Sequence, residues 1–237
     1  MENKEYKTNL IAGLPIEIID LCKVYPLTLR EIGEIGVNEY NSRLSLLLTD
    51  PKTIKTEIQL NRFDAYDILL STSIKNQEFR HKIEQSLSMF LKDRVVFSID
   101  HKRPFFVVNK KYITNEHFKQ IVDILKIQNL KQLTTDKPQT VKNMSKKHQQ
   151  LLKKRKRGRK LMDVASGKSE ATLGDIISNL GIYTQSINNI LDWTIYQLYD
   201  QYSKFMQAEN YRNNFLMYIG GADPKALNLK KHWTLKQ

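Results

Sequence analysis

The sequence predicts an α+β protein that is predominantly helical, with small β-hairpins in an N-terminal domain and a helical C-terminal region. Three observations lead to this fold class. The 237 residues include only 9 Gly and 6 Pro, which disfavours an all-β protein with many tight turns. Apolar residues recur at helical spacing in several stretches. Two shorter stretches are instead rich in β-branched and aromatic residues, which is typical of strands.

The first predicted elements are two short extended pieces between residues 16 and 24, followed by a helix that runs as far as residue 48. Thr28 and Glu31 have the spacing of a capping box, in which each side chain satisfies a free backbone N–H at the start of the helix. Gly33 and Gly36 lie inside this helix and weaken it locally.

The middle of the chain predicts helices, then a hairpin, then another helix. Two helical pieces are expected over residues 62–92, and Asn76 is a suitable N-cap for the second. The period changes over residues 94–113, where we expect a β-hairpin with a longer loop. A helix over residues 115–127 follows, with Thr114 as its cap.

The domain organisation is predicted from a change in composition after this helix. Residues 1–130 form the α+β domain. Residues 131–168 are polar and then basic, and they include Pro138, so we expect a linker or a connector helix. Residues 169–237 form the helical C-terminal region, in which Thr172 caps a short helix and Gly220 follows a long one.

The basic segment is the main candidate for a charged interaction. The formal net charge of the protein is +13, and much of it comes from residues 146–160. The positive charge is therefore a local feature and not a property of the whole surface. If this segment binds the phosphates of nucleic acid, its affinity should depend strongly on salt concentration. We favour the alternative that it is a solvated connector, which needs no nucleic acid. A third hypothesis is that it acts as a targeting signal. The candidate phosphate-binding residues are Lys153, Lys154, Arg155, Lys156, Arg157, Arg159 and Lys160.

Aromatic residues are concentrated in the long C-terminal helix. Such residues can stack on bases, but a stripe at helical spacing more often forms a core face or a surface for a protein partner. We therefore predict a partner-binding surface or core face, with a second copy of the protein as one of the candidate partners. Its residues are Trp193, Tyr196, Tyr199, Tyr202 and Phe205.

Catalytic signatures are missing from the sequence. No histidine pairs with another His or with Cys at metal-ligand spacing, and no phosphate loop or nucleophile motif occurs. Cys22 is the single cysteine, so an internal disulfide is excluded; we interpret it as a small buried apolar residue and not as a catalytic thiol. We expect no enzyme activity, no catalytic or metal-binding residues and no cofactor.

Membrane association is not expected either. The first ten residues, MENKEYKTNL, are polar and charged and do not fit a signal peptide. No apolar run approaches the roughly 18 residues that a membrane span requires.

Three stretches carry a resemblance to a known family. They are "VYPLTLREIGEIGVNEYN" (24–41), "DWTIYQLYDQYSKF" (192–205) and "LKKHW" (229–233), the last after a "GGADP" break. Their order, with the basic connector between the first two, resembles the tail assembly chaperones of phages and prophages of Gram-positive bacteria. The resemblance extends over most of the chain but is dense only in these three stretches. The density of the basic segment departs from the family pattern.

The resemblance implies a non-enzymatic role in tail assembly or virion morphogenesis, in which the protein binds tape-measure or tail-tube protein. It implies action in the host cytoplasm during assembly, and retention in the virion stays open. The family offers no catalytic residues to transfer. Two alternatives remain at this point: a phage nucleic-acid-binding protein that uses residues 146–160, or a structural component of the virion. A homo-oligomer also remains open.

Overall fold

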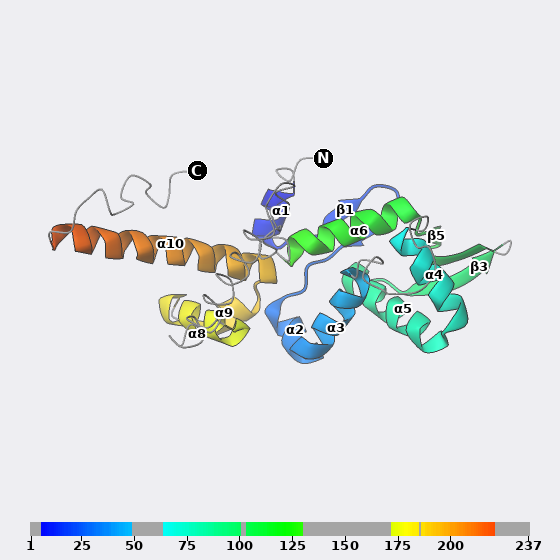
Figure 1. Ribbon diagram of the computed structural model, residues 1–237, viewed down its shortest axis with the longest axis horizontal. Helices are drawn as coiled ribbons and strands as arrows, with labels where there is room; N and C mark the ends of the chain where they lie inside the picture. The colour runs from blue at the N-terminus through cyan, green and yellow to red at the C-terminus, as the bar shows by residue number, and fades with distance from the viewer. Residues whose placement is uncertain (1–5, 49–63, 101–102, 130–171, 185, 221–237) are drawn as a thin grey trace, which may run out of the picture. The chain divides into compact units, whose positions relative to one another are not determined.

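The computed structural model describes residues 6–48, 64–100, 103–129, 172–184 and 186–220 (Figure 1). Helices account for 69% of these residues, and two small antiparallel sheets accompany them. The predicted fold class, α+β and predominantly helical, is confirmed. The chain forms two compact units, one made of residues 1–130 and 191–237 and the other of residues 131–190. This division into two units does not test the boundaries predicted for the linker (131–168) and the C-terminal region (169–237), which stay predictions.

The N-terminal elements are a short helix and a two-stranded sheet. Helix α1 (Lys7–Ala12) has no counterpart in the sequence prediction. It ends at Gly13, whose φ of 69° is in the left-handed region that glycine adopts without strain. Strands β1 (Ile16–Ile18) and β2 (Cys22–Val24) pair antiparallel, with Ile16 opposite Val24. These strands confirm the predicted extended pieces.

The predicted helix up to residue 48 is two helices, so that prediction was wrong in its continuity. Helix α2 (Leu29–Ile35) and helix α3 (Val37–Leu48) are separated by Gly36, which has a φ of 92°. A right-handed helix cannot continue through that conformation, so the chain changes direction there. The capping box of Thr28 and Glu31 at the start of α2 is confirmed.

The three helices that follow agree with the sequence prediction. Helices α4 (Ala65–Lys75) and α5 (Gln77–Leu91) are separated at Asn76, whose side chain accepts a hydrogen bond of 2.9 Å from the N–H of Phe79. Helix α6 (Asn115–Gln128) begins at the predicted cap, Thr114. The caps were predictable because each depends on residues only three positions apart.

The second sheet has three strands where the sequence predicted a hairpin of two. Strand β3 (Val95–Asp100) pairs with β4 (Arg103–Val108), and β4 pairs with β5 (Lys111–Tyr112), all antiparallel. The predicted second strand is divided by a tight turn at Asn109 and Lys110, which have φ values of 51° and 63°. Two successive residues with positive φ are the signature of a type I′ turn, and the absence of glycine here concealed it.

Strand β3 lies at an edge of this sheet, and helix α5 covers part of that edge. The N–H of Phe97 donates to Oε1 of Glu84 at 2.7 Å, and the N–H of Val95 donates to Oγ of Ser88 at 2.9 Å. Both acceptors are side chains of α5. These donors are therefore satisfied by a helix and not by another strand.

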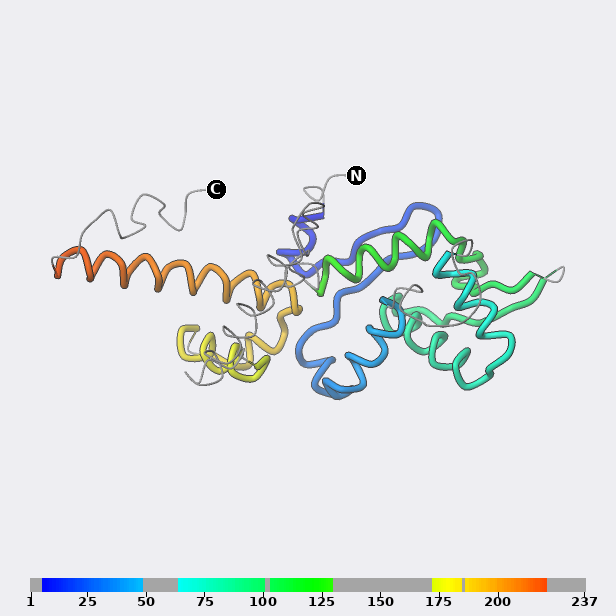
Figure 2. The backbone as a smooth tube through the Cα atoms, in the orientation of Figure 1, coloured from blue at the N-terminus to red at the C-terminus, as the bar shows by residue number. Residues whose placement is uncertain are grey.

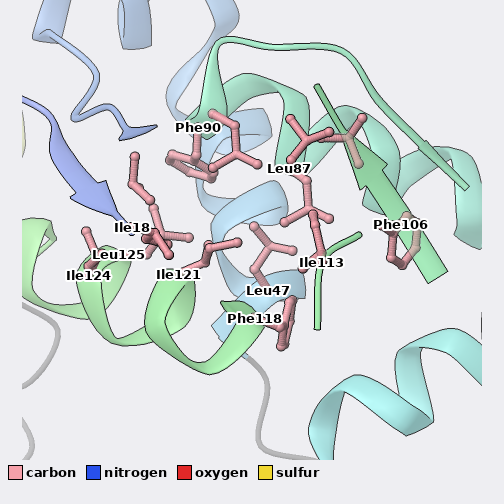
Figure 3. Close-up of a cluster of buried hydrophobic side chains, with 14 of the residues drawn as sticks. Ile18, Leu47, Leu87, Phe90, Phe106, Ile113, Phe118, Ile121, Ile124 and Leu125 are labelled. Carbon is pink, nitrogen blue, oxygen red and sulfur yellow. The ribbon is translucent and has the colours of Figure 1, made fainter. Parts of the chain in front are cut away.

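The hydrophobic core of the first unit lies between α3, α5, α6 and the strands (Figure 3). Leu87, Phe106 and Leu125 are completely buried. Helix α6 packs against β1 and β2, which come far earlier in the chain (Figure 2). The Tyr66 hydroxyl joins α4 to the second sheet, because it donates to the carbonyl of Ile113 at 2.6 Å and accepts from the N–H of Phe106 at 3.2 Å.

The described residues between 172 and 191 form two short helices. Helix α8 (Leu173–Thr184) begins after Thr172, which exchanges hydrogen bonds with Asp175 and confirms the predicted cap. Helix α9 (Ile187–Leu191) follows. A Cβ atom at Gly181 would lie 2.8 Å from the Ile187 side chain, so the close packing of this pair requires glycine.

The last described helix, α10 (Ile195–Ile219), confirms the predicted long C-terminal helix. Its N-cap is Thr194, which forms a capping box with Gln197. Its C-cap is Gly220, in agreement with the predicted helix stop.

Candidate partner-binding helix

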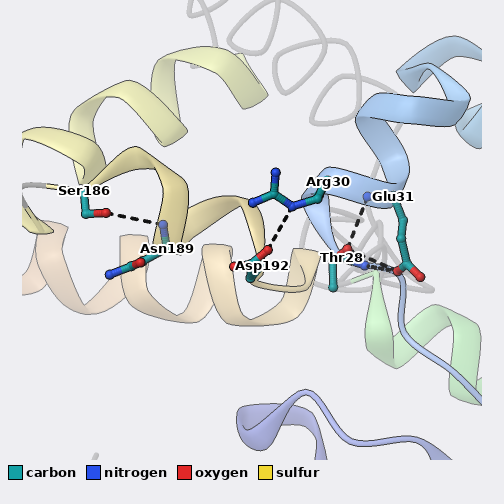
Figure 4. A network of polar contacts seen from close by, with 6 residues as sticks. All are labelled: Thr28, Arg30, Glu31, Ser186, Asn189 and Asp192. Carbon is teal, nitrogen blue, oxygen red and sulfur yellow. Dashed lines mark hydrogen bonds and ion pairs between the residues drawn. The ribbon is translucent and has the colours of Figure 1, made fainter.

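The start of α10 is joined to the start of α2 by backbone contacts. Figure 4 shows the Arg30–Asp192 ion pair of the same junction. The N–H of Leu29 donates to the carbonyl of Trp193 at 2.8 Å. Thr28 and Thr194, the N-caps of the two helices, form an isolated antiparallel bridge. Two of the stretches that carry the family resemblance, 24–41 and 192–205, therefore meet at their helix caps.

Side chains add two further contacts at this junction. Gln197 donates from Nε2 to the carbonyl of Ile11 at 2.8 Å, while its Oε1 accepts from the N–H of Thr194. Arg30 Nε lies 3.0 Å from Asp192 Oδ1, but both side chains are largely exposed. The ion pair therefore contributes little by itself, and the backbone contacts and the glutamine define the junction.

Glu31 is the main charged group at the cap of α2. Partial burial favours its neutral form, but hydrogen bonds from Lys92 and Thr28 and the positive charge of Lys92 outweigh that effect. The pKa of Glu31 is consequently below its usual value. An ionised carboxylate at a helix N-terminus also interacts favourably with the helix dipole.

Burial along α10 is confined to its first turns. Among the residues of α10, all of which the structure describes, only Leu198 is buried, and it is completely buried. Ile195 and Tyr196 are half-buried against the core of the first unit. The first two turns thus anchor the helix, and they leave much of the remaining surface accessible.

The structure separates the five predicted partner-binding residues into different environments. Trp193 lies just before the helix and is half-buried, and Tyr196 packs on the core. Tyr199 is exposed, whereas Tyr202 and Phe205 are half-buried, with ring centroids 6.4 Å apart. Only the last two are brought together, so the five do not form one continuous exposed stripe.

The most exposed apolar group of α10 lies at its C-terminal end, which the residue-level prediction did not include. Five consecutive side chains there are between 46% and 67% exposed: Phe215, Leu216, Met217, Tyr218 and Ile219. Five consecutive apolar residues surround a helix on all sides, so one packed face cannot cover them all. The run "FLMYI" in the sequence was the signal that could have identified them.

Cys22 does not have the properties of a reactive thiol. It is half-buried in β2 against the core, and burial, with a smaller effect from the charge of Asp93, raises its pKa to about 11. A thiol with this pKa is almost entirely protonated at neutral pH and is a weak nucleophile. Its environment fits the predicted role as a small apolar residue.

The other predicted interaction site, the basic residues of the 146–160 segment, lies outside the described residues, as does the stretch 229–233. Within the part of the chain that the structure describes, no group of three or more His, Cys, Asp or Glu residues could hold a metal ion. In the same residues no helix is both long and apolar enough to cross a membrane.

Comparison with protein families finds a match in the C-terminal part of the chain. Residues 165–236 match the model of a family described as the YomV second domain. That family is associated with phages and prophages. The YomV match includes α8, α9 and all of α10. No curated protein and no solved structure gives a significant match to the chain.

Proposed function

We propose that this protein is a non-enzymatic phage tail-assembly or virion morphogenesis protein that binds tape-measure or tail-tube protein through α10. The observation that carries the proposal is the exposed apolar end of α10 in the region that matches the YomV second domain. The resemblance of residues 24–41 and 192–205 to tail assembly chaperones supports the same function.

The physical argument concerns the cost of exposing apolar surface. Burial of apolar area contributes about 25 cal/mol per Å², so several exposed large side chains on one helix favour association with a partner. An amphipathic partner segment in a helix-in-groove arrangement would cover such a surface. The proposed role requires α10 to hold exposed apolar segments of unassembled tail proteins reversibly in the host cytoplasm.

The experiment is co-purification of tail proteins with the tagged full chain from cells in which the phage or prophage is induced. We expect tape-measure or tail-tube protein to associate with the unaltered chain and to stay bound as salt is raised, because the contact is apolar. The Phe215→Asp/Met217→Asp variant should lose at least roughly tenfold of the captured protein, since two charges would have to be buried.

A matched control uses Gln207→Asp, which places the same charge at an exposed polar position of α10. This variant should capture tail protein normally. The proposal fails if no tail protein associates with the unaltered chain. It also fails if both variants capture as much as that chain does.

The remaining readings make different predictions. Nucleic-acid binding by residues 146–160 predicts an affinity for DNA that falls steeply with salt. A structural role predicts that the protein is present in purified virions. Both stay predictions.

A further inference from the structure

The apolar residues of α10 follow a seven-residue pattern that continues beyond its anchored end. Positions three and four apart along one side of the helix are Leu198, Tyr202, Phe205, Glu209, Arg212, Leu216 and Ile219. This spacing is that of the a and d positions of a coiled coil. Leu198 is completely buried, so the segment available for a partner helix is 202–219, roughly five turns in length.

Glu209 and Arg212, in the middle of this segment, make its charges complementary to those of a second copy that runs in the opposite direction. Rotation of a second copy end over end, about the midpoint between residues 210 and 211, places Glu209 opposite the Arg212 of that copy. The same rotation places Phe205 opposite Leu216 and Tyr202 opposite Ile219. A parallel arrangement instead places each Glu209 opposite another Glu209, and like charges at such positions are destabilising.

The local geometry is compatible with the reversed arrangement. Within one helix, Arg212 Nη1 is 3.8 Å from Glu209 Oε1, and the Arg212 side chain is 70% exposed, so its guanidinium can also meet a second carboxylate. In the flanking positions, Ala208 would face Phe215 of the other copy. A small residue opposite a large one lets two helices pack without a void.

We propose that a second copy of this chain covers the 202–219 segment, as an antiparallel α10–α10 pair centred on two Glu209–Arg212 contacts. The charge complementarity selects a second copy over an unrelated apolar helix, which would leave Arg212 without a carboxylate opposite it. The proposal does not rest on the tail-assembly function. When tail protein is absent, self-association would shield the same apolar surface.

The pair is expected to be weak. About five turns of a two-stranded contact bury less area than the roughly 1,200 Å² of a standard stable interface. We therefore expect a dissociation constant on the order of ten micromolar, and a mixture of monomer and dimer in purified protein.

The first test is sedimentation equilibrium of the purified full chain and two variants. Leu216 and Tyr218 are both exposed but lie on opposite sides of α10. Leu216→Asp should weaken the dimer at least roughly tenfold because the charge would be buried in the pair, whereas Tyr218→Asp should leave it unchanged. Equal circular dichroism spectra would show that both variants keep the fold.

A charge-exchange test examines the central contacts. Glu209→Arg alone puts four positive charges at the centre of the pair, and Arg212→Glu alone puts four negative charges there, so each variant should be monomeric. An equimolar mixture should restore a dimer, because every Arg then faces a Glu. Failure of the mixture to associate would overturn the assignment of these residues to the interface.

The orientation is tested with spin labels at Ser203→Cys or Asn210→Cys in a Cys22→Ser background. These positions are seven residues apart, so they share one side of the helix. In the reversed pair the two labels at residue 210 lie nearly level, while those at residue 203 are separated by about 21 Å more along the axis, at 1.5 Å per residue. Equal distances at both positions would show a parallel pair and would overturn the proposal.

A chain that remains monomeric at several hundred micromolar would also overturn it. These measurements use purified protein without tail components, whereas the co-purification experiment uses induced cells. Loss of the dimer with retained tail-protein capture, or the reverse, therefore shows which of the two proposals has failed.

Discussion

At the scale of single residues, Glu31 has an effect on stability that depends on pH. Its pKa is lower in the folded protein than the ordinary value of 4.5. The stabilisation by the ionised form is therefore fully present above the unfolded-state pKa and is lost as pH falls through the folded-state pKa.

We predict that Glu31→Gln lowers the free energy of unfolding by about 0.5 kcal/mol at pH 7, a small value because the side chain is partly exposed. The difference from the unaltered chain should shrink progressively as the pH is lowered below 4.5. Urea denaturation at pH 7 and at a series of lower pH values measures both effects. Glu34→Gln, an exposed change in the same helix, should show a smaller difference at pH 7. A Glu31→Gln effect that is independent of pH would contradict the electrostatic account.

At the scale of elements, the break between α2 and α3 depends on one glycine of a nearby pair. Gly36 has a φ of 92°, whereas Gly33 lies inside α2, and a Cβ at Gly33 would meet no other atom within 4 Å. We predict that Gly36→Ala destabilises the protein by about 1 kcal/mol or more, because a Cβ is strained at that φ. Gly33→Ala should instead stabilise it by about 0.5–1 kcal/mol through helix propensity. Thermal unfolding compares the two variants, and shifts of the same sign would contradict this interpretation.

At the scale of the whole molecule, the anchoring of α10 brings residues from the two ends of the chain into one unit. Leu198 is the only buried residue of this helix, so we predict that Leu198→Ala costs about 2–5 kcal/mol in unfolding free energy. Met217→Ala, an exposed change in the same helix, should cost little, which makes it the matched control. Chemical denaturation at low protein concentration measures both. Similar losses in the two variants would show that Leu198 is not the anchor.

The sequence predicted features that depend on neighbouring residues and missed those that depend on distant ones. The caps at Thr28 and Thr114 follow from residues three positions away, and the helices of the core follow from their apolar periodicity. The bridge between Thr28 and Thr194 has no local signal, because it joins segments from opposite ends of the chain. Helix α1 is only six residues long, which is too short for periodicity to show.

The sequence predicted only part of the candidate partner-binding surface, because the exposure of its residues depends on contacts with distant parts of the chain. The aromatic character of α10 was apparent from its sequence. Which aromatic residues stay exposed depends on where the core covers the helix, so the burial of Tyr196 against that core could not be foreseen. Five consecutive apolar residues at 215–219 did carry a local signal, since no single face of a helix can bury them all.

The covered edge of the three-stranded sheet has a consequence for the behaviour of the protein at high concentration. Glu84 and Ser88 occupy the N–H groups of Phe97 and Val95, so an incoming strand would have to displace both side chains before it could pair there. The opposite edge is β5, which is only two residues long. Open strand edges are the usual starting points for intermolecular β-pairing and fibril growth. The proposed association through α10 would therefore face little competition from aggregation through the sheet.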